Sequence, residues 1–366
     1  MRNLIVATAV AAACFTSVNT YAAEETTKVS GVGFIDLTNI DKTTTNKTSG
    51  VETKDVGNGI GLDVSRFYLI VDHVFDDIWS ANVTTDFQYS STIGATELFM
   101  KKAYVQAKFN DAFIVRAGAA SMPWIDGTES LYGYRYVEKT VTDLEGVVST
   151  ADWGVHVLGK AAGGKFSYGV SAVNGGGFKN PTRSKSVDFE GRISFVPVKG
   201  LNFALGAYSG KRGKETDLNP AEKTFTRFDV LAAYVVDKFR VGVEYYTLSN
   251  LNSVQQDGSP AAANGVIPSA ASIDTDKAKA YSGWAAFNFL PNASVFVRYD
   301  DQKINPNDTS NSSRENTNKY INVGVSYQPR KNIDMALVYK NTKTDTNFGT
   351  TDSKKDEIGV WSLVKF

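Results

Sequence analysis

The residues of this sequence most able to do chemistry are charged side chains that alternate with apolar ones. In the stretch 296–300, Phe-Val-Arg-Tyr-Asp, the charged residues are two positions apart. Charges arranged in this way along a hydrated path can attract or repel passing ions. We predict ten such positions: Asp86, Lys102, Lys108, Arg116, Glu190, Arg192, Arg240, Glu244, Arg298 and Asp300. Because both signs are present, we expect weak ion selectivity.

Other kinds of chemistry find little support. The two histidines, His73 and His156, are too few and too far apart to indicate a metal site. The single cysteine lies near the N-terminus, and the glycines at 175–177 precede no helical pattern that could hold a phosphate. A catalytic Ser/His pair would need His156 to point to the outside of the sheet. Asp152 and Lys160 lie on the same face of its strand, however, and indicate that this face is the inner one. We therefore expect no catalytic residue, no metal, no cofactor and no enzyme activity.

The composition allows either several ordinary domains or one large all-β unit. The chain has 366 residues, 39 basic and 39 acidic, and its mean hydropathy is -0.22. Beyond the N-terminus it contains no apolar run of about 20 residues, which excludes spanning helices. Charges are scattered singly, so no basic block points to nucleic acid.

The first 22 residues read as a signal peptide. Arg2 supplies a positive end and residues 4–15 an apolar core, and Thr20-Tyr-Ala22 offers small residues for cleavage. The mature unit would then be 23–366. It would contain no cysteine, so its stability must come from hydrogen-bonded sheet or core rather than from disulfides.

Downstream of residue 22, the sequence contains segments in which apolar and polar residues alternate. Very short turns connect these segments at one end, and long polar stretches connect them at the other. Strands of about 9–11 residues, short turns and long loops are typical of an outer-membrane β-barrel. A soluble all-β fold would also alternate, but it gives no reason for long loops at one end only. We predict a transmembrane antiparallel barrel of sixteen strands: 29–36, 60–75, 79–89, 98–109, 112–120, 151–160, 165–173, 186–197, 201–210, 227–236, 239–248, 278–290, 293–301, 318–328, 333–341 and 357–366.

In such a barrel the apolar rows face lipid and the polar rows face water. A lysine or arginine facing the middle of the bilayer would cost roughly 2–4 kcal/mol, so the charged rows must point to a hydrated interior. Several apolar rows end in an aromatic residue next to a turn, as at Phe109, Tyr234 and Tyr327. Rings at these places indicate the aromatic girdles of a membrane barrel.

The insert 121–150 has an unusual composition for a loop in water. It carries several rings and a set of charges: Asp126, Glu129, Arg135, Glu138 and Lys139. We predict a constriction loop that folds into the barrel, packs its rings on the wall and offers its charges to the lumen. An outer loop that packs on a neighbouring subunit is the alternative. A second insert, 249–277, is rich in Ser, Ala and Asn and is expected to form an exposed loop.

The last ten residues predict the place where the barrel closes. A strand at 357–366 would have only the first strand left as a partner, and Val360, Val364 and Phe366 would face lipid. Trp361 and Leu363 then fall in the inner row, which is unexpected for apolar side chains. Either they pack beneath the insert 121–150, which is the third long loop, or the strand carries a bulge.

In this arrangement the sequence resembles the bacterial outer-membrane porins. Sixteen strands, an inward third loop and the terminal Phe366 match the trimeric porins. The stretch Lys101-Lys-Ala-Tyr-Val-Gln-Ala-Lys-Phe109, with Val115-Arg-Ala-Gly118 and Pro123, is similar to the phosphate-selective porin O/P family. The resemblance implies a homotrimer, contact with outer-membrane lipids and lipopolysaccharide, and recognition of the terminal strand by the barrel-assembly machinery.

These expectations lead to a water-filled channel of the outer membrane through which small hydrophilic solutes diffuse. The family's phosphate selectivity does not carry over directly, because the predicted basic positions are balanced by acidic ones. An anion- or phosphate-preferring pore is one alternative. A non-conducting barrel that uses residues 252–271 for adhesion or receptor contact is another.

Overall fold

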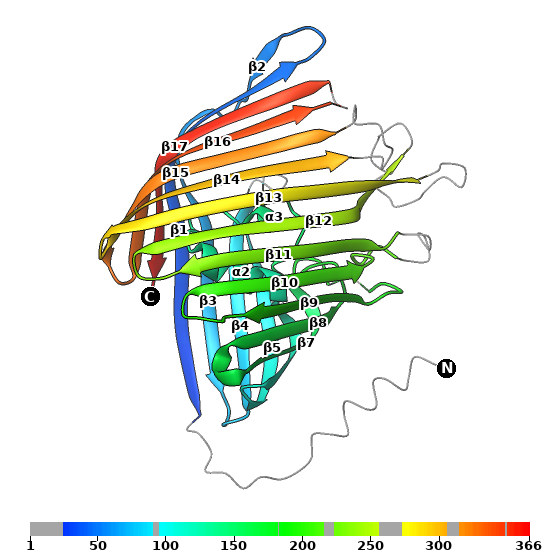
Figure 1. Cartoon of the computed structure of the whole chain (residues 1–366), viewed down its shortest axis with the longest axis vertical. Coiled ribbons are helices and arrows are strands. Elements are labelled where there is room, and N and C mark those ends of the chain that lie inside the picture. The colour runs from blue at the N-terminus through cyan, green and yellow to red at the C-terminus, as the bar shows by residue number, and fades with distance from the viewer. Residues whose placement is uncertain are drawn as a thin grey trace.

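A closed wall of antiparallel strands makes up most of the computed structural model, which describes residues 25–90, 95–181, 183–215, 223–255, 273–305, 315–347 and 350–366. Each strand of the wall pairs with the next one along the chain, and β1 pairs with β17 to complete the ring (Figure 1). Sixteen strands form the ring, which confirms the predicted fold class. A short extra strand, β2, extends the tip of β1.

The strands of the ring vary in length, from 8 residues in β8 and β9 to 21 in β1. The first half contains β1 (Thr26–Asn46), β2 (Glu52–Lys54), β3 (Gly59–Val74), β4 (Trp79–Ser90), β5 (Ala95–Asn110), β6 (Phe113–Ser121), β7 (Ala151–Ala161) and β8 (Phe166–Val173). The second half contains β9 (Asp188–Phe195), β10 (Leu201–Gly210), β11 (Phe225–Val235), β12 (Phe239–Gln255), β13 (Ile273–Leu290), β14 (Ala293–Asn305), β15 (Asn316–Arg330), β16 (Ile333–Thr346) and β17 (Thr351–Lys365).

The last strand closes the barrel, as predicted. Val32 pairs with Lys365, and the pairing continues without a break to Asn46 and Thr351. On its other side β17 pairs with β16, again in continuous register. The terminal Phe366 is exposed on the outside, and its backbone exchanges hydrogen bonds with Gly31.

Several strands run further than predicted at the end with the long connections. The stretch 37–46 was expected to lie in a loop but belongs to β1, and residues from both ends of the predicted loop 249–277 belong to β12 and β13. These extensions are rich in Thr, Asn, Lys and Asp, and apolar patterning therefore could not reveal them. Polar strands can form here because main-chain pairing, not contact with lipid, holds them together.

Apolar side chains on the outside alternate with covered ones facing the interior. The exposed row includes Phe113, Val155, Phe228, Tyr234 and Tyr327, as predicted. No helix among the described residues is long and apolar enough to cross a membrane. The predicted signal peptide, 1–22, and the stretch 256–272 lie outside the described residues.

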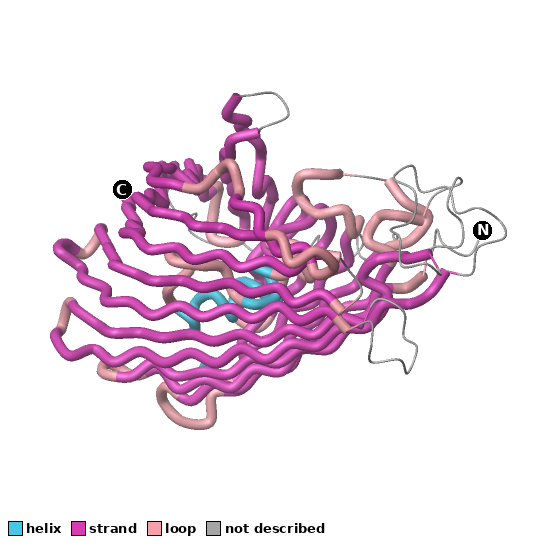
Figure 2. The backbone as a smooth tube through the Cα atoms, turned by 90° about the horizontal axis from the view of Figure 1, so that it is seen from above, coloured by secondary structure: helices cyan, strands magenta, loops and turns pink. Residues whose placement is uncertain are grey.

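Two short helices lie within the ring of strands. Helix α2 (Pro123–Tyr132) and helix α3 (Val141–Leu144) belong to the connection between β6 and β7. Figure 2, seen from above, shows these helices behind the curved wall of strands. One 3₁₀ turn, η1 (Ala162–Gly164), joins β7 to β8 at the opposite end from the long connections.

Candidate functional site: the barrel interior

Helix α2 is held at both ends by charged side chains of the inner wall. At its start, the backbone N–H of Trp124 donates to a Glu190 carboxylate oxygen at 2.9 Å. At its end, the Arg240 guanidinium donates to the carbonyls of Ser130 and Leu131, at 3.0 and 2.5 Å. A carboxylate at a helix N-terminus and a cation at its C-terminus both complement the helix dipole, each contributing about 0.3–1 kcal/mol.

The Trp124 side chain forms a second attachment. Its ring is completely buried, and its indole N–H donates to Glu244 at 2.9 Å. Gly206 of β10 leaves room for the ring, because a Cβ at that position would lie 2.4 Å from it. Arg192 donates to the Trp124 carbonyl at 2.7 Å. Residues of β9, β10 and β12 thus fix one point of the insert.

The second half of the insert is attached to β14 and β16. Arg298 makes a two-pronged ion pair with Asp300, at 2.9 and 2.5 Å, and also donates to the carbonyl of Lys139. Lys340 donates to the Val137 carbonyl at 2.6 Å and to the Glu138 carboxylate at 3.1 Å. Each of these cations binds a backbone carbonyl of the insert, so the attachment depends on the path of the chain as well as on side-chain charge.

Apolar side chains fill the space between the insert and the wall. Tyr136 and Val137 pack with Trp361 and Leu363 of the last strand. This contact explains why two apolar side chains occupy the inner row, and it confirms the first of the two explanations offered from the sequence. Two further clusters join the insert to the wall through Met122, Trp124, Ile125, Tyr132, Val141 and Val147.

The ion pair between Glu138 and Lys340 should make the attachment of the insert depend on pH. Mutation of Lys340 should change that dependence. Burial raises the pKa of the Glu138 carboxyl, but Lys340, the Lys139 N–H and Arg298 outweigh it, and the pKa lies below its ordinary value. The link therefore contributes fully above the ordinary pKa and is lost as the pH falls through the lowered one. In Lys340→Met, burial should dominate and raise the pKa of Glu138. Because the substitution also removes the ammonium that makes the link, the variant lacks this attachment at every pH, and only the wild type should lose it on acidification.

Single-channel current noise, followed from neutral pH down to about pH 4, would measure this difference. We expect Lys340→Met to be noisy already at neutral pH, and the wild type to become noisy only as the pH falls. Lys355→Met is a matched control, because Lys355 pairs with Glu357 at 2.9 Å within β17 rather than with the insert. Identical pH profiles for Lys340→Met and the wild type would contradict the prediction.

Most of the ten predicted pore positions face the interior, but six of them are buried. Asp86 is buried against Arg66, at 2.7 Å. Lys108 is different, since it pairs with Asp111 at 2.8 Å beside the short β5–β6 turn, far along the strand from the insert. The side chains buried beneath or beside the insert are Glu190, Arg192, Glu244, Arg298 and Asp300. Four of these five bond to the insert, Asp300 binds Arg298, and together they expose little charge to water.

The five predicted charges of the insert have different surroundings. Asp126 is exposed, whereas Arg135 pairs with Glu129 at 2.6 Å and with Asp143 at 3.3 Å. Glu138 pairs with Lys340, and the Lys139 side chain lines a small cavity with Asp36 and Arg66. Three of the five charges are therefore already neutralised by a partner.

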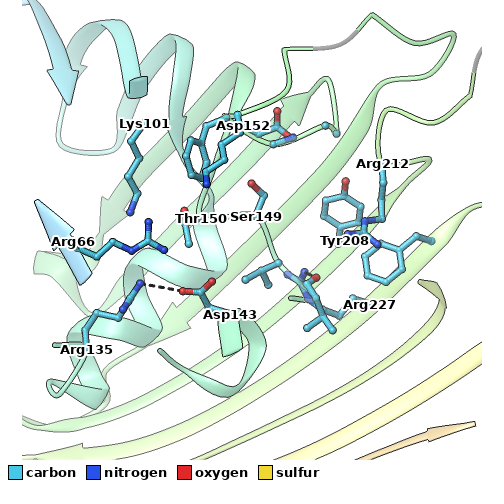
Figure 3. A pocket seen from close by; sticks show the side chains of 18 residues that line it. Arg66, Lys101, Arg135, Asp143, Ser149, Thr150, Asp152, Tyr208, Arg212 and Arg227 are labelled. Atoms are coloured by element: carbon cyan, nitrogen blue, oxygen red, sulfur yellow. Dashed lines mark hydrogen bonds and ion pairs between the residues drawn. The ribbon is translucent and has the colours of Figure 1, made fainter. Parts of the chain in front are cut away.

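Two larger cavities lie on different sides of the insert. One, of about 330 Å³, is lined by residues of the long connections and by Arg66, Lys101, Arg135 and Arg212. Figure 3 shows these cations and Asp143 pointing into it. The other, of about 410 Å³, is lined by Arg116, Asp126, His156 and Lys160 and by residues next to the short turns. The insert thus separates one cavity near each end of the barrel.

Comparison with solved structures shows the architecture to which this geometry belongs. The outer-membrane channel DcaP of Acinetobacter baumannii has a TM-score of 0.62 and 16% identity, over 95% of this chain and 100% of that one. A loop-deleted OmpT, an outer membrane protein of Vibrio cholerae, has a TM-score of 0.60 and 12% identity, over 94% and 100%. The anion-selective porin from Comamonas acidovorans has a TM-score of 0.58 and 11% identity, over 94% and 100%. The fold is that of the outer-membrane porins.

The sequence alone is too distant to identify a relative. No protein-family model matches the chain. No curated protein matches it either.

Lys101 and Arg66 line the porin-type interior but were missed from the sequence. The register of β4 against β5 shifts between Thr84 and Thr85, so that Lys101 is an extra residue in a bulge. Lys101 therefore points inward like its neighbour Lys102, and its ammonium contacts the Tyr68 hydroxyl at 2.9 Å. The adjacent lysines could have revealed the bulge, because a regular strand would turn one of them to lipid.

Inward-facing cations without an acidic partner gather on β5 and β6. Among the described residues, Lys101, Lys102 and Arg116 have no carboxylate within ion-pairing distance. Arg116 instead donates to Gln106 at 2.9 Å and lies 4.9 Å from the Tyr104 ring. This side of the interior, opposite the wall that holds the insert, therefore carries positive charge without acidic partners, whereas Arg192 and Arg240 bind backbone carbonyls of the insert.

The histidines do not assemble a reactive centre in the described part of the chain. His156 is buried in the inner row and shares a hydrogen bond of 2.8 Å with Ser171, while its other ring nitrogen has no hydrogen-bond partner. A catalytic triad would need a carboxylate there to orient the ring. Within the described residues, no group of three or more His, Cys, Asp and Glu side chains is placed to hold a metal ion.

Proposed function

We propose that this protein is a porin of the bacterial outer membrane, through which small hydrophilic solutes and ions diffuse passively. The observation that carries the proposal is the interior of the closed barrel, where charged rows face two cavities separated by the insert. The apolar outer row and the porin fold support a location in the membrane. The protein acts in this proposal as a channel and not as an enzyme.

The insert 121–150 is the constriction of the proposed channel. Its backbone is attached at Trp124, Ser130, Leu131, Val137 and Lys139, so it is held across the interior at several points. Because the attachments lie on β9–β16, solutes would pass on the other side, along β3–β7. The predicted alternative, an outer loop that contacts a neighbouring subunit, receives no support from these contacts.

Reconstitution in a planar bilayer tests the proposal. Purified protein should give stepwise increases in current, each from one inserting assembly, that stay open at low voltage. A water-filled channel should also show a conductance that rises with salt concentration, because the ions pass in water. An absence of current steps at high protein load would contradict the proposal.

A preference for anions is the second candidate. It is favoured by the three unpaired cations Lys101, Lys102 and Arg116, and the resemblance to the phosphate-selective porin O/P family points the same way. The reversal potential in a salt gradient distinguishes the two: a permeability ratio near one supports general diffusion, and a clear excess of anion permeability supports the second candidate. Competition of phosphate with chloride current would test the finer selectivity.

We also propose the assembly of a homotrimer, with outer-membrane lipids around it and folding assisted by the barrel-assembly machinery. The large exposed apolar side chains of the wall support contact with lipid or with other subunits. Mobility on gels before and after boiling would report both the closed barrel and the trimer, because each resists unfolding until heated.

A further inference from the structure

The cavity near the short turns is lined by an unusual combination of hydroxyl groups and cations. It has a volume of about 410 Å³. Five of its lining residues are serines, three are Arg or Lys, and one, Asp126, is acidic. A lining of this composition can hold a charged group at one place and neutral polar groups at several others.

One cross-strand row in this cavity runs from Arg116 of β6 through His156 of β7 to Ser171 of β8, each residue standing opposite the next. Neighbouring strands lie about 5 Å apart, so the row spans roughly 10 Å. His156 is buried, and its Nδ1 shares a hydrogen bond of 2.8 Å with Ser171. Its Nε2 has no hydrogen-bond partner among the described residues. A buried polar atom without a partner is costly, and a hydroxyl group of a bound solute would satisfy it.

A second cross-strand row runs from Lys160 of β7 through Ser167 of β8 to Ser194 of β9, four residues along β7 and β8 from the first. Within the described part of the chain, Lys160 and Ser167 form no ion pair and no side-chain hydrogen bond. Ser194 accepts a hydrogen bond from Arg192 at 3.0 Å, which leaves its own O–H to donate. Each row therefore combines one cation with groups that can still form hydrogen bonds.

Asp126 of α2 restricts the kind of solute that this cavity can accept. It is exposed, lines the same cavity and forms no ion pair in the part of the chain that the structure describes. A carboxylate repels a compact oxyanion such as phosphate, but it accepts hydrogen bonds from hydroxyl groups. The hydroxyl groups of the two rows are also spread over a wider area than one tetrahedral oxyanion can contact.

We propose that this cavity binds a polyhydroxylated carboxylate, the chemical class of the sugar acids. Its carboxylate would contact Arg116 or Lys160, and its hydroxyl groups would bond to His156, to the serines of the two rows and to Asp126. The inference deepens the proposed function and rests on it, since the bound solute would be one that passes through the channel.

Three solutes with equal numbers of carbon atoms separate the effect of charge from that of hydroxyl groups. Gluconate carries both, hexanoate carries the charge alone, and sorbitol carries the hydroxyl groups alone. Single-channel current in potassium chloride should fall reversibly as gluconate is added, because a bound solute obstructs the ions. Hexanoate, sorbitol and phosphate should bind at least tenfold more weakly, since each lacks several of the contacts. Isothermal titration calorimetry of the solubilised protein measures the same affinities without conduction.

Two variants test the two kinds of contact separately. Ser167→Ala, Ser194→Ala removes two hydroxyl groups and no charge, so gluconate should bind about tenfold more weakly while hexanoate binding stays the same. Lys160→Gln should weaken the binding of gluconate and of hexanoate but leave that of sorbitol unchanged. The matched control, Ser49→Ala, Ser353→Ala, changes two serines at the end with the long connections and should bind gluconate like the wild type.

The wild type and the serine variant decide the inference together. Equal affinity of the wild type for gluconate and hexanoate, or for gluconate and phosphate, would overturn it. Equal gluconate affinity in the wild type and the serine variant would also overturn it. The serine variant should keep the conductance of the wild type in potassium chloride and its heat-resistant mobility on gels, which shows that it folds. An absence of conductance in the wild type would contradict the proposed function instead.

Discussion

Trp124→Ala is expected to release the insert from the inner wall and to raise the single-channel conductance several-fold. The substitution empties a fully buried site that Gly206 keeps open, and it removes the hydrogen bond to Glu244. Truncation of a buried tryptophan costs about 3–5 kcal/mol. That loss falls on the attachment of α2 and not on the strand pairing, so the barrel should remain closed while its interior widens.

Two variants separate release of the insert from general damage. Trp124→Phe keeps most of the ring and loses the indole N–H, so its conductance should increase less. Trp79→Ala truncates a tryptophan that is exposed on the outer face of β4 and should leave the conductance unchanged. If Trp124→Ala conducts like the wild type and keeps its heat-resistant mobility on gels, the insert does not limit the current.

Reversing two charges on the opposite wall should change which ions the channel prefers. In Lys102→Glu, Arg116→Glu, two inward-facing cations without acidic partners become anions beside the cavity of Arg116 and Asp126. Because ions in the narrow region respond to the sign of the nearest charges, the reversal potential should move toward the cation limit. The shift should shrink at high salt, where the Debye length falls to about 3 Å.

Lys108→Glu is the matched control for this experiment. The residue lies on β5, as Lys102 does, but at the short-turn end and beside Asp111. It should produce a much smaller shift of the reversal potential. Equal shifts from the two variants would mean that the mouth of the channel, and not the region beside the insert, sets ion preference.

The wall of the barrel could be predicted from the sequence because lipid imposes a simple rule on it. Each strand must be apolar on one face, and the alternation gave all sixteen strands and the pairing of the last strand with the first. The rule stops applying outside the bilayer. For this reason the polar extensions of β1, β12 and β13 were missed.

The interior was harder to predict, because no single rule governs it. From the sequence, charged side chains that face inward are expected to contact water. Glu190, Glu244 and Arg298 face inward but are buried against the insert. Their partners include backbone and indole groups of α2 and the residues after it, which only the folded path of the insert brings near. The bulge at Lys101 is a further example, since one extra residue reverses the direction of every side chain before it.

The seam between β1 and β17 has a consequence for the timing of assembly. The strands that meet there are separated by more than three hundred residues, so the ring cannot close until both have been synthesised. Until then β1 and whichever strand is at the growing end both present unpaired backbone groups. A chain of this kind must be kept from associating with its neighbours until β17 has paired with β1, because unpaired strand edges can join other chains.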